Sequence, residues 1–310
     1  MNELHKTSLN TPPPRLNIIG TGKLGRTLAR LLSDAGQVTI GDIYNRKMAS
    51  SHSAQAFMGA GRVLSNIEQF SNKSAELWMI ATPDDAIRPC AEQLATLVTI
   101  NWSTSTVFHC SGLKTSAELS ALQTLGSAVA SVHPAHSFAS PERSLASFAT
   151  SVCTLEGDRA ATSRLASLFR AIDGQTTTIT PEAKPLYHAA TVMASNYLVA
   201  LIGASETLLE KSGIEGPLAS AILAPLMRQS LENGLHEGAV NALTGPLARG
   251  DISTLQAHLV ALEQTAPDLS DTYRSMGIQA LKLARQTNAL NKNELTAIEK
   301  LLQQKNKQPI

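Results

Sequence analysis

The sequence contains few cysteines and few charged residues. Cys90, Cys110 and Cys153 are odd in number, widely spaced and without a C-x-x-C pair. This pattern argues against a disulfide framework and favours a reducing compartment, where each thiol serves as a small buried apolar side chain. Charged residues make up 16% of the chain, below the usual quarter, and apolar residues make up 43%, so we expect a compact globular protein.

The chain also lacks a net charge and a long apolar run. Lys and Arg number 26 against 25 Asp and Glu, so no overall field attracts nucleic acid or an anionic membrane. The most apolar stretch, residues 197–204, is far shorter than the roughly 18 residues that span a bilayer. Residues 1–14 are polar and unlike a signal peptide, and they predict a flexible tail. We therefore expect a soluble cytoplasmic protein without nucleic-acid or membrane partners.

The 310 residues suffice for two domains, and the first part of the chain alternates between strand-like and helical patterns. The patterns predict strands at 15–19, 38–44, 77–81, 106–109, 128–132, 151–155 and 176–179, and helices at 23–35, 48–58, 86–97 and 158–172. Parallel strands need such crossover helices, so the alternation predicts a mostly parallel sheet that is covered on both faces.

The pattern changes at Pro181. Strand-like runs disappear, and long helical stretches follow at 182–212, 217–243, 254–261, 269–287 and 294–304. Pro181 suits the first turn of a helix, and Gly213 suits the position just after one. We expect a domain boundary near residue 180 and an all-α domain over residues 181–310.

A glycine-rich hexapeptide joins the first predicted strand directly to the first helix. It consists of Gly20, Thr21, Gly22, Lys23, Leu24 and Gly25, in the pattern G-x-G-x-x-G. Gly20 permits a tight turn, Gly22 lets a pyrophosphate approach the backbone, and Gly25 lets the helix pack closely on the strand. Free N–H groups at the helix start would hold the phosphates. Residues 15–180 are therefore predicted to form a doubly wound α/β domain of the Rossmann type that binds a dinucleotide.

The end of the second strand indicates which dinucleotide binds. An acidic residue there binds a ribose 2′-hydroxyl, whereas a basic residue accepts a 2′-phosphate. Asp42 lies inside the strand, so we place Asn45 and Arg46 at the ribose, with Lys47 as a supporting charge. This arrangement favours NADP over NAD. The alternative is that Arg46 and Lys47 only decorate an exposed turn.

The third clear strand ends at a sheet edge where ligands of open α/β sheets bind. We expect Ala81 and Thr82 to line the nicotinamide side of the cofactor site, with Pro83 beside them. Asp84 comes next, and we favour a role as N-cap of the following helix over direct ligand contact.

Four polar residues share one face of the first long helix of the second domain, by the helical spacing of 100° per residue: Lys184, His188, Thr191 and Ser195. A polar stripe on an otherwise apolar helix suits a cleft. Lys184, with a pKa lowered by burial, or His188 could donate a proton to a substrate, and Asn196 could orient it. The alternative for His188 is an ordinary helix histidine.

Loops at other strand ends and between helices add candidates for substrate binding. Ser111, His133 and His136 follow two neighbouring strands. The two histidines have H-x-x-H spacing, but no acidic or cysteine ligand accompanies them, so we expect no metal site. Arg249 either binds a substrate carboxylate or belongs to a simple helix connection with Asp251 as its cap.

The sequence resembles a group of Rossmann-like bacterial proteins that carry a C-terminal helical domain of unknown function. This group belongs with deazaflavin-type NADP oxidoreductases, pyrroline-5-carboxylate reductases and beta-hydroxyacid dehydrogenases, in the 6-phosphogluconate dehydrogenase C-terminal-like superfamily. The marks of the resemblance are Gly20 to Gly25, Cys110-Ser111-Gly112, His133-Pro134, Lys184 to Asn196, and Leu243-Thr244-Gly245-Pro246 with Arg249-Gly250-Asp251.

By this resemblance, Lys184 takes the place of a catalytic lysine, and His188 stands where the dehydrogenases have an asparagine. Thr244 belongs to a shortened relative of a loop that contacts substrate in the pyrroline carboxylate reductases. Those enzymes dimerise through the helical domain, so the resemblance implies a homodimer.

These observations together predict an NADP(H)-dependent oxidoreductase that acts on a small carbonyl, hydroxy-acid or imine substrate. One alternative is a non-catalytic NADP sensor or partner-binding protein on the same fold. Another is an enzyme that works with a flavin or deazaflavin.

Overall fold

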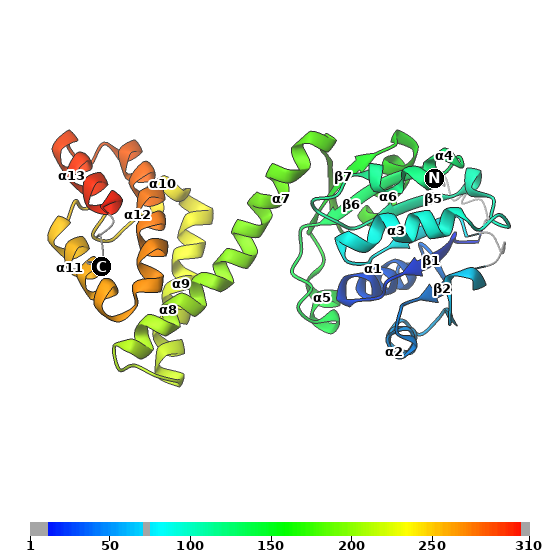
Figure 1. Cartoon of the computed structure of the whole chain (residues 1–310), viewed down its shortest axis with the longest axis horizontal. Helices are drawn as coiled ribbons and strands as arrows, with labels where there is room; N and C mark the ends of the chain where they lie inside the picture. The colour runs from blue at the N-terminus through cyan, green and yellow to red at the C-terminus, as the bar shows by residue number, and fades with distance from the viewer. Residues whose placement is uncertain (1–11, 71–74, 305–310) are drawn as a thin grey trace, which may run out of the picture. The chain divides into compact units, whose positions relative to one another are not determined.

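The computed structural model describes residues 12–70 and 75–304, and its first part contains an eight-stranded sheet (Figure 1). Most of the tail predicted at 1–14 lies outside the described residues. The strands are β1 (Arg15–Ile19), β2 (Thr39–Tyr44), β3 (Arg62–Leu64), β4 (Leu77–Ile80), β5 (Thr106–His109), β6 (Ala128–Pro134), β7 (Val152–Gly157) and β8 (Gln175–Thr178). Their order is β3-β2-β1-β4-β5-β6-β7-β8, and neighbours are parallel except β6 and β7.

Helices cover both faces of this sheet. On one face lie α1 (Lys23–Asp34), α2 (Met48–Met58), α5 (Pro141–Ser147) and α6 (Arg159–Arg170), and on the other lie α3 (Asp84–Ala95) and α4 (Ser120–Thr124). The central strands β1 and β4 are almost wholly buried, as expected for apolar runs covered on both sides. The predicted doubly wound, mostly parallel α/β fold is confirmed.

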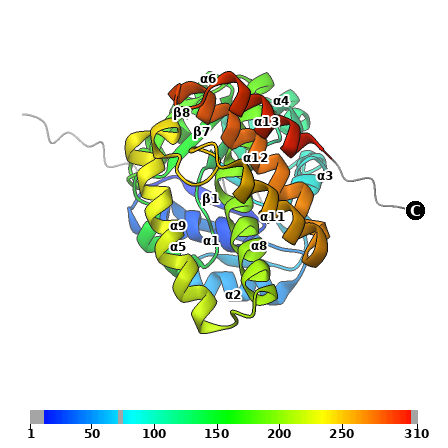
Figure 2. The ribbon, with the colours of Figure 1, turned by 90° about the vertical axis from the view of Figure 1, so that its left-hand side faces the viewer.

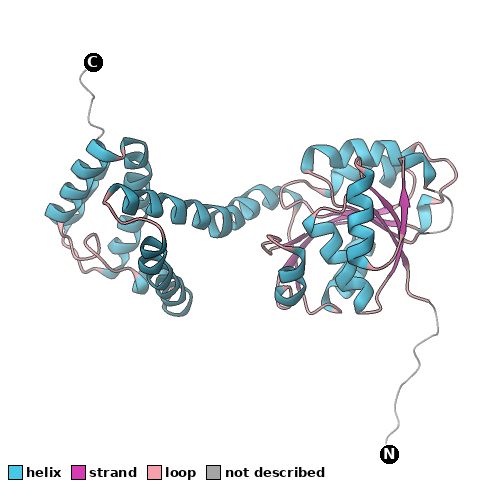
Figure 3. Cartoon of the chain, turned by 90° about the horizontal axis from the view of Figure 1, so that it is seen from below, coloured by secondary structure: helices cyan, strands magenta, loops and turns pink. Residues whose placement is uncertain are grey.

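The second part of the chain is helical, and Figure 3 shows strands only in the first part. Its helices are α8 (Leu198–Lys211), α9 (Pro217–Glu237), α10 (Ala239–Ala242), α11 (Ile252–Thr265), α12 (Pro267–Thr287) and α13 (Lys292–Gln303). Figure 2 looks onto this group. Leu255, Leu281 and Ile298, from three of the helices, belong to its core. The predicted helix over 217–243 breaks at Gly238, whose φ of 80° interrupts the helical backbone.

The chain divides into two compact units, Met1–Ser195 and Asn196–Ile310, which we call the Rossmann unit and the helical unit. This division lies later than residue 180, because α7 (Lys184–Val192) is tied to the Rossmann unit by its first residue. A π-helical turn, Met193–Tyr197, joins α7 to α8.

One helical stretch of the described residues, Pro181–Lys211, is long and apolar enough to cross a membrane by length and composition alone. No residue in the most apolar 18-residue segment of this stretch is buried. The sequence predicted no run of this length, because its longest uninterrupted apolar stretch is residues 197–204. Lys184, near the start of this stretch, is buried within the Rossmann unit.

Candidate functional site

The loop between β1 and α1 fits closely against the end of β4. Gly20 has a φ of 85°, and a Cβ there would lie 2.7 Å from the Ala81 carbonyl oxygen. A Cβ on Gly25 would lie 3.0 Å from Ala81 Cβ and would overlap the Gly20 carbonyl oxygen. Both positions therefore require glycine. A Cβ on Gly22 would meet nothing within 4 Å, so the space in front of the first turn of α1 is open.

Asn45 holds this loop in place. Its Oδ1 accepts the Thr21 backbone N–H at 2.7 Å, and its Nδ2 donates to Thr21 Oγ1 at 2.6 Å and to Ser51 Oγ at 2.9 Å. The sequence predicted Asn45 at the cofactor ribose. In the structure Asn45 lines the cavity in front of this loop, while the three hydrogen bonds of its amide go to Thr21 and Ser51.

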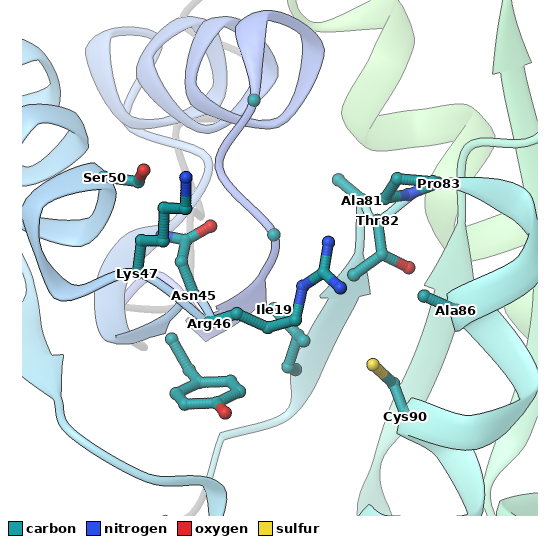
Figure 4. A pocket seen from close by; sticks show the side chains of 13 residues that line it. Ile19, Asn45, Arg46, Lys47, Ser50, Ala81, Thr82, Pro83, Ala86 and Cys90 are labelled. Carbon is teal, nitrogen blue, oxygen red and sulfur yellow. The ribbon is translucent and has the colours of Figure 1, made fainter.

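A cavity of about 610 Å³ opens in front of the glycine loop. Its lining includes Gly20, Gly22, Tyr44, Asn45, Arg46, Lys47, Ala81, Thr82, Pro83 and Cys90. Figure 4 shows the guanidinium of Arg46 extending into the middle of this cavity. Neither Arg46 nor Lys47 forms an ion pair with any residue that the structure describes.

Two further features of the cavity suit a polar ligand. Thr82 Oγ1 is buried and has no hydrogen-bond partner within residues 12–70 and 75–304. Backbone N–H groups in the first turn of α1 have no partner within the helix itself. A dinucleotide would supply acceptors for both, and Arg46 would supply positive charge to a phosphate. The residues present therefore fit such a ligand.

Asp42 is excluded from this cavity, as the sequence predicted. Its carboxylate is buried inside β2 and pairs with Arg15 at 2.9 Å and with Arg62 at 2.8 Å. Strand β2 ends at Tyr44, so the basic residues begin after the strand end.

A second polar cluster lies at the carboxyl ends of β5 and β6, next to α7. Tyr187 Oη and His133 Nδ1 are 2.8 Å apart, and the His133 and His188 rings meet edge to face at 5.6 Å. Gly112 lies between the two histidines: a Cβ there would overlap His188 Nδ1 and lie 3.0 Å from His133 Nε2. We call His133, Tyr187 and His188 the histidine cluster.

Burial keeps His133 neutral. Loss of hydration, with smaller contributions from the positive charges of His188 and Lys184, lowers the pKa of His133 to about 4. A neutral ring has one nitrogen that can donate a hydrogen bond and one that can accept one.

Lys184 does not reach the surface of this cluster. Its side chain is 1% exposed, and Nζ donates to Ser111 O at 3.1 Å and to Ser131 Oγ at 2.8 Å. Burial lowers the pKa of the ammonium, as the sequence analysis expected. A substrate could not touch a group enclosed in this way, so the structure argues against Lys184 as the proton donor.

Two other side chains are engaged within the protein. The Ser111 hydroxyl donates to Asp84 Oδ2 at 2.7 Å and accepts the backbone N–H groups of Leu113 and Lys114, so it has no capacity left for a substrate. The interpretation of Asp84 as an N-cap is wrong, because Pro83 occupies that position and the Asp84 carboxylate binds Ser111.

His136 also differs from the expectation. Its ring nitrogens contact Ser151 Oγ at 3.1 Å and Ser147 Oγ at 3.4 Å, and its ring packs against Phe138 and Phe148. We assign it a packing role. Within the residues that the structure describes, no group of three His, Cys, Asp or Glu side chains could hold a metal ion.

The remaining candidates belong to the helical unit. Asn196, Thr244 and Arg249 are exposed there. Asp251 caps α11 by accepting the Thr254 N–H, in agreement with one of the two alternatives for this segment. All three cysteines are free; Cys110 and Cys153 are buried as predicted, whereas Cys90 is partly exposed and lines the cavity.

Sequence reasoning missed two residues of the site. Tyr187 precedes His188 and lies outside the polar stripe, although a tyrosine among alanines and leucines was a usable signal. Glu156 is buried in β7 and accepts a hydrogen bond from Ser131. A carboxylate within a predicted apolar strand indicates a buried partner.

Two family models match the chain, and the second match begins inside the Rossmann unit rather than at its end. Residues 2–134 match the Rossmann-like domain, and residues 151–280 match a domain of unknown function, DUF2520. No curated protein matches the sequence.

Solved structures share the fold over nearly the whole chain. Protein TM1727 from Thermotoga maritima is 26% identical with a TM-score of 0.68, covering 88% of this chain and 99% of that one. BF3122 from Bacteroides fragilis, provisionally named an NADP oxidoreductase, is 17% identical with a TM-score of 0.72, covering 87% and 98%. The Plasmodium falciparum pyrroline carboxylate reductase with NADP bound is 13% identical with a TM-score of 0.55, covering 90% and 98%.

The lowered pKa of His133 predicts a loss of stability in mild acid. The folded protein holds a proton on this ring less tightly than the unfolded chain does, so stability falls as the pH drops from about 6.5 towards 4. Urea unfolding at pH 7 and pH 4.5 measures the difference in the free energy of unfolding between the two pH values. His133→Asn should make this difference smaller by about 2 kcal/mol. His236→Asn, at the last turn of α9, should keep the wild-type dependence. Equal pH dependence in wild type and His133→Asn would contradict the assignment.

Proposed function

We propose that this chain, which matches the models of a Rossmann-like domain and of DUF2520, is an NADP(H)-dependent oxidoreductase. The substrate we propose is a small carbonyl, hydroxy-acid or imine compound. The observation that carries the proposal is the cavity at the glycine loop, where open space, backbone N–H groups and the unpaired Arg46 meet. The names of BF3122 and of the NADP-bound pyrroline carboxylate reductase support it.

Arg46 is the residue that favours NADP over NAD. A guanidinium can donate two parallel hydrogen bonds to a phosphate, and Arg46 has no carboxylate partner within the described residues. The one acidic residue of β2, Asp42, is occupied by two arginines. No carboxylate of that strand is therefore free to bind a ribose 2′-hydroxyl.

NADPH, when bound, would supply the hydride to the substrate carbon. The chain must then deliver one proton to the substrate oxygen or nitrogen, so that the substrate gains two electrons and two hydrogens. We assign this proton to the ring of His188, which is partly exposed and lies against Gly112 and His133. Tyr187 and His133 adjoin this ring and would orient the substrate heteroatom by hydrogen bonds.

We also propose that the protein is a homodimer formed through the helical unit. Leu218, Ile222 and Leu226 succeed each other at one-turn spacing on α9, and Leu218 and Leu226 are 59% and 61% exposed. Tyr197, which directly precedes the neighbouring α8, and Val199, near its start, are 61% and 66% exposed. Because the net charge of the chain is close to zero, two copies repel each other little. The apolar residues Leu218, Ile222 and Leu226 can pack against the same residues of a second copy.

The three free cysteines suit a reducing compartment, and we propose a cytoplasmic location on that ground.

Arg46→Ala should weaken NADPH binding about 10- to 100-fold and leave NADH binding nearly unchanged, because only the phosphate contact is lost. Fluorescence titration with both cofactors measures this. Arg88→Ala is the matched control: Arg88 lies on α3 outside the cavity and pairs with Glu118. Comparable affinity of the wild type for NADH and NADPH would contradict the NADP assignment.

His188→Ala should lower kcat/KM for an identified carbonyl or imine substrate at least 100-fold while NADPH affinity stays within twofold. His236→Ala serves as the control, since this histidine lies on α9. If NADPH binds tightly and no compound in a broad carbonyl and imine panel oxidises it, a non-catalytic NADP-binding role replaces the enzymatic one. Unchanged turnover in His188→Ala would remove the proposed proton donor.

Leu226→Glu should convert a dimer to a monomer in analytical ultracentrifugation, because a charge would be buried in an apolar interface. Val98→Glu is the control, since Val98 is 94% exposed in the Rossmann unit. A wild-type protein that sediments as a monomer at micromolar concentration would refute the dimer.

A further inference from the structure

The ammonium of Lys184 is connected to a buried carboxylate that the proposed chemistry does not use. Lys184 Nζ donates to Ser131 Oγ at 2.8 Å, and Ser131 Oγ donates to Glu156 Oε2 at 3.0 Å. Lys184 and Glu156 are 1% and 4% exposed. One serine hydroxyl therefore bridges two charges inside the Rossmann unit.

The hydrogen-bond partners of the two groups suit an ammonium and a carboxylate. Lys184 also donates to Ser111 O, so both printed partners of its ammonium are acceptors. The carboxylate of Glu156 accepts the Ser116 N–H at 2.8 Å and the Ser116 hydroxyl at 2.7 Å, besides Ser131. Its three partners are thus all donors, which suits an ionised carboxylate. Separating one charge from the other would leave it buried and uncompensated.

The two charges hold opposite ends of one loop. Lys184 binds the carbonyl of Ser111, and Glu156 binds both the backbone and the side chain of Ser116. His109 closes the same loop from inside, because its Nε2 contacts the Thr115 carbonyl at 3.0 Å and its Nδ1 accepts the Ser111 N–H. We call residues 111–116 the pinned loop.

Gly112 in the pinned loop fills the gap between two rings of the histidine cluster. A single Cβ at this position would overlap His188 Nδ1 and crowd His133 Nε2. A shift of the loop by a fraction of an ångström would therefore displace one ring or open space between them.

We propose that Lys184 and Glu156 are positioning residues, which through Ser131 fix the pinned loop so that His133 and His188 stay on either side of Gly112. The proposal rests on the proposed function in so far as the histidine cluster is the reaction site. It gives Lys184 a role that needs no contact with substrate. It also explains why a lysine is enclosed in this unit beside two histidines.

The charge environment of His133 agrees with this arrangement. Burial lowers the pKa of His133 most, and the charges of His188 and Lys184 lower it further, whereas Asp84 opposes them. Tyr187 adds a hydrogen bond at Nδ1. Removing the Lys184 charge should therefore raise the pKa of His133, an effect that a purely space-filling residue would not produce.

The test uses the full-length protein and two readouts that need no substrate. In Lys184→Met, backbone hydrogen exchange at Ser111 and Ser116, whose N–H groups are hydrogen-bonded, should accelerate at least tenfold, and NMR titration should show the pKa of His133 rising from about 4. Ser131→Ala keeps both charges and removes only the bridge, so it should accelerate exchange in the pinned loop even if Lys184→Met fails to fold. Lys114→Met is the control, because Lys114 lies in the same loop and its ammonium lies 3.8 Å from Glu118.

Hydrogen-exchange rates in the pinned loop that equal those of the wild type in both Lys184→Met and Ser131→Ala would overturn the proposal. So would an unchanged pKa of His133 in a folded Lys184→Met protein, because Lys184 would then be a packing residue only. NADPH affinity should stay unchanged in these variants, since neither residue lines the cavity. If the wild type binds no NADPH, the proposed function fails, while exchange and titration still decide the role of Lys184.

Discussion

The close approach of the β1–α1 loop to the end of β4 is the constraint on which the candidate cofactor site depends. Gly20 and Gly25 allow helix α1 to start almost in contact with Ala81, because a side chain at either glycine would overlap backbone. This contact brings the first turn of α1 next to the residues that follow β4. Asn45 then fixes the loop from the β2 side, so three neighbouring strands define one cavity.

A different kind of constraint shapes the neighbouring part of the sheet edge. In that part, buried charged residues fix the position of the backbone, whereas glycines do so at the β1–α1 loop. Lys184 and Glu156 bind the loop after β5. Burying a lysine and a glutamate is costly, and it is tolerated when every donor and acceptor finds a partner. Helix α7 is consequently part of the Rossmann unit, which ends three residues after it.

The sequence predicted those parts of the structure in which a residue type has a single common role, such as glycine in a tight turn or an apolar run in a buried strand. Apolar runs predicted the central strands, and the glycine spacing predicted the loop. The three-residue strand β3 is too short for any periodic pattern. The hydrogen-bond partners of Asn45, Ser111 and Lys184 could not be predicted from sequence spacing. Each of these side chains bonds to a residue distant in sequence, and such bonds decide whether a polar group faces a ligand or the protein.

The central claim is that the glycine loop and Arg46 together bind NADP(H). A crystal structure of the protein with NADPH tests it most directly. The account predicts the pyrophosphate against the backbone of Gly22 and the first turn of α1, with the 2′-phosphate on the guanidinium of Arg46. A cofactor whose phosphates lie away from Gly22, or whose 2′-phosphate makes no contact with Arg46, would contradict the account.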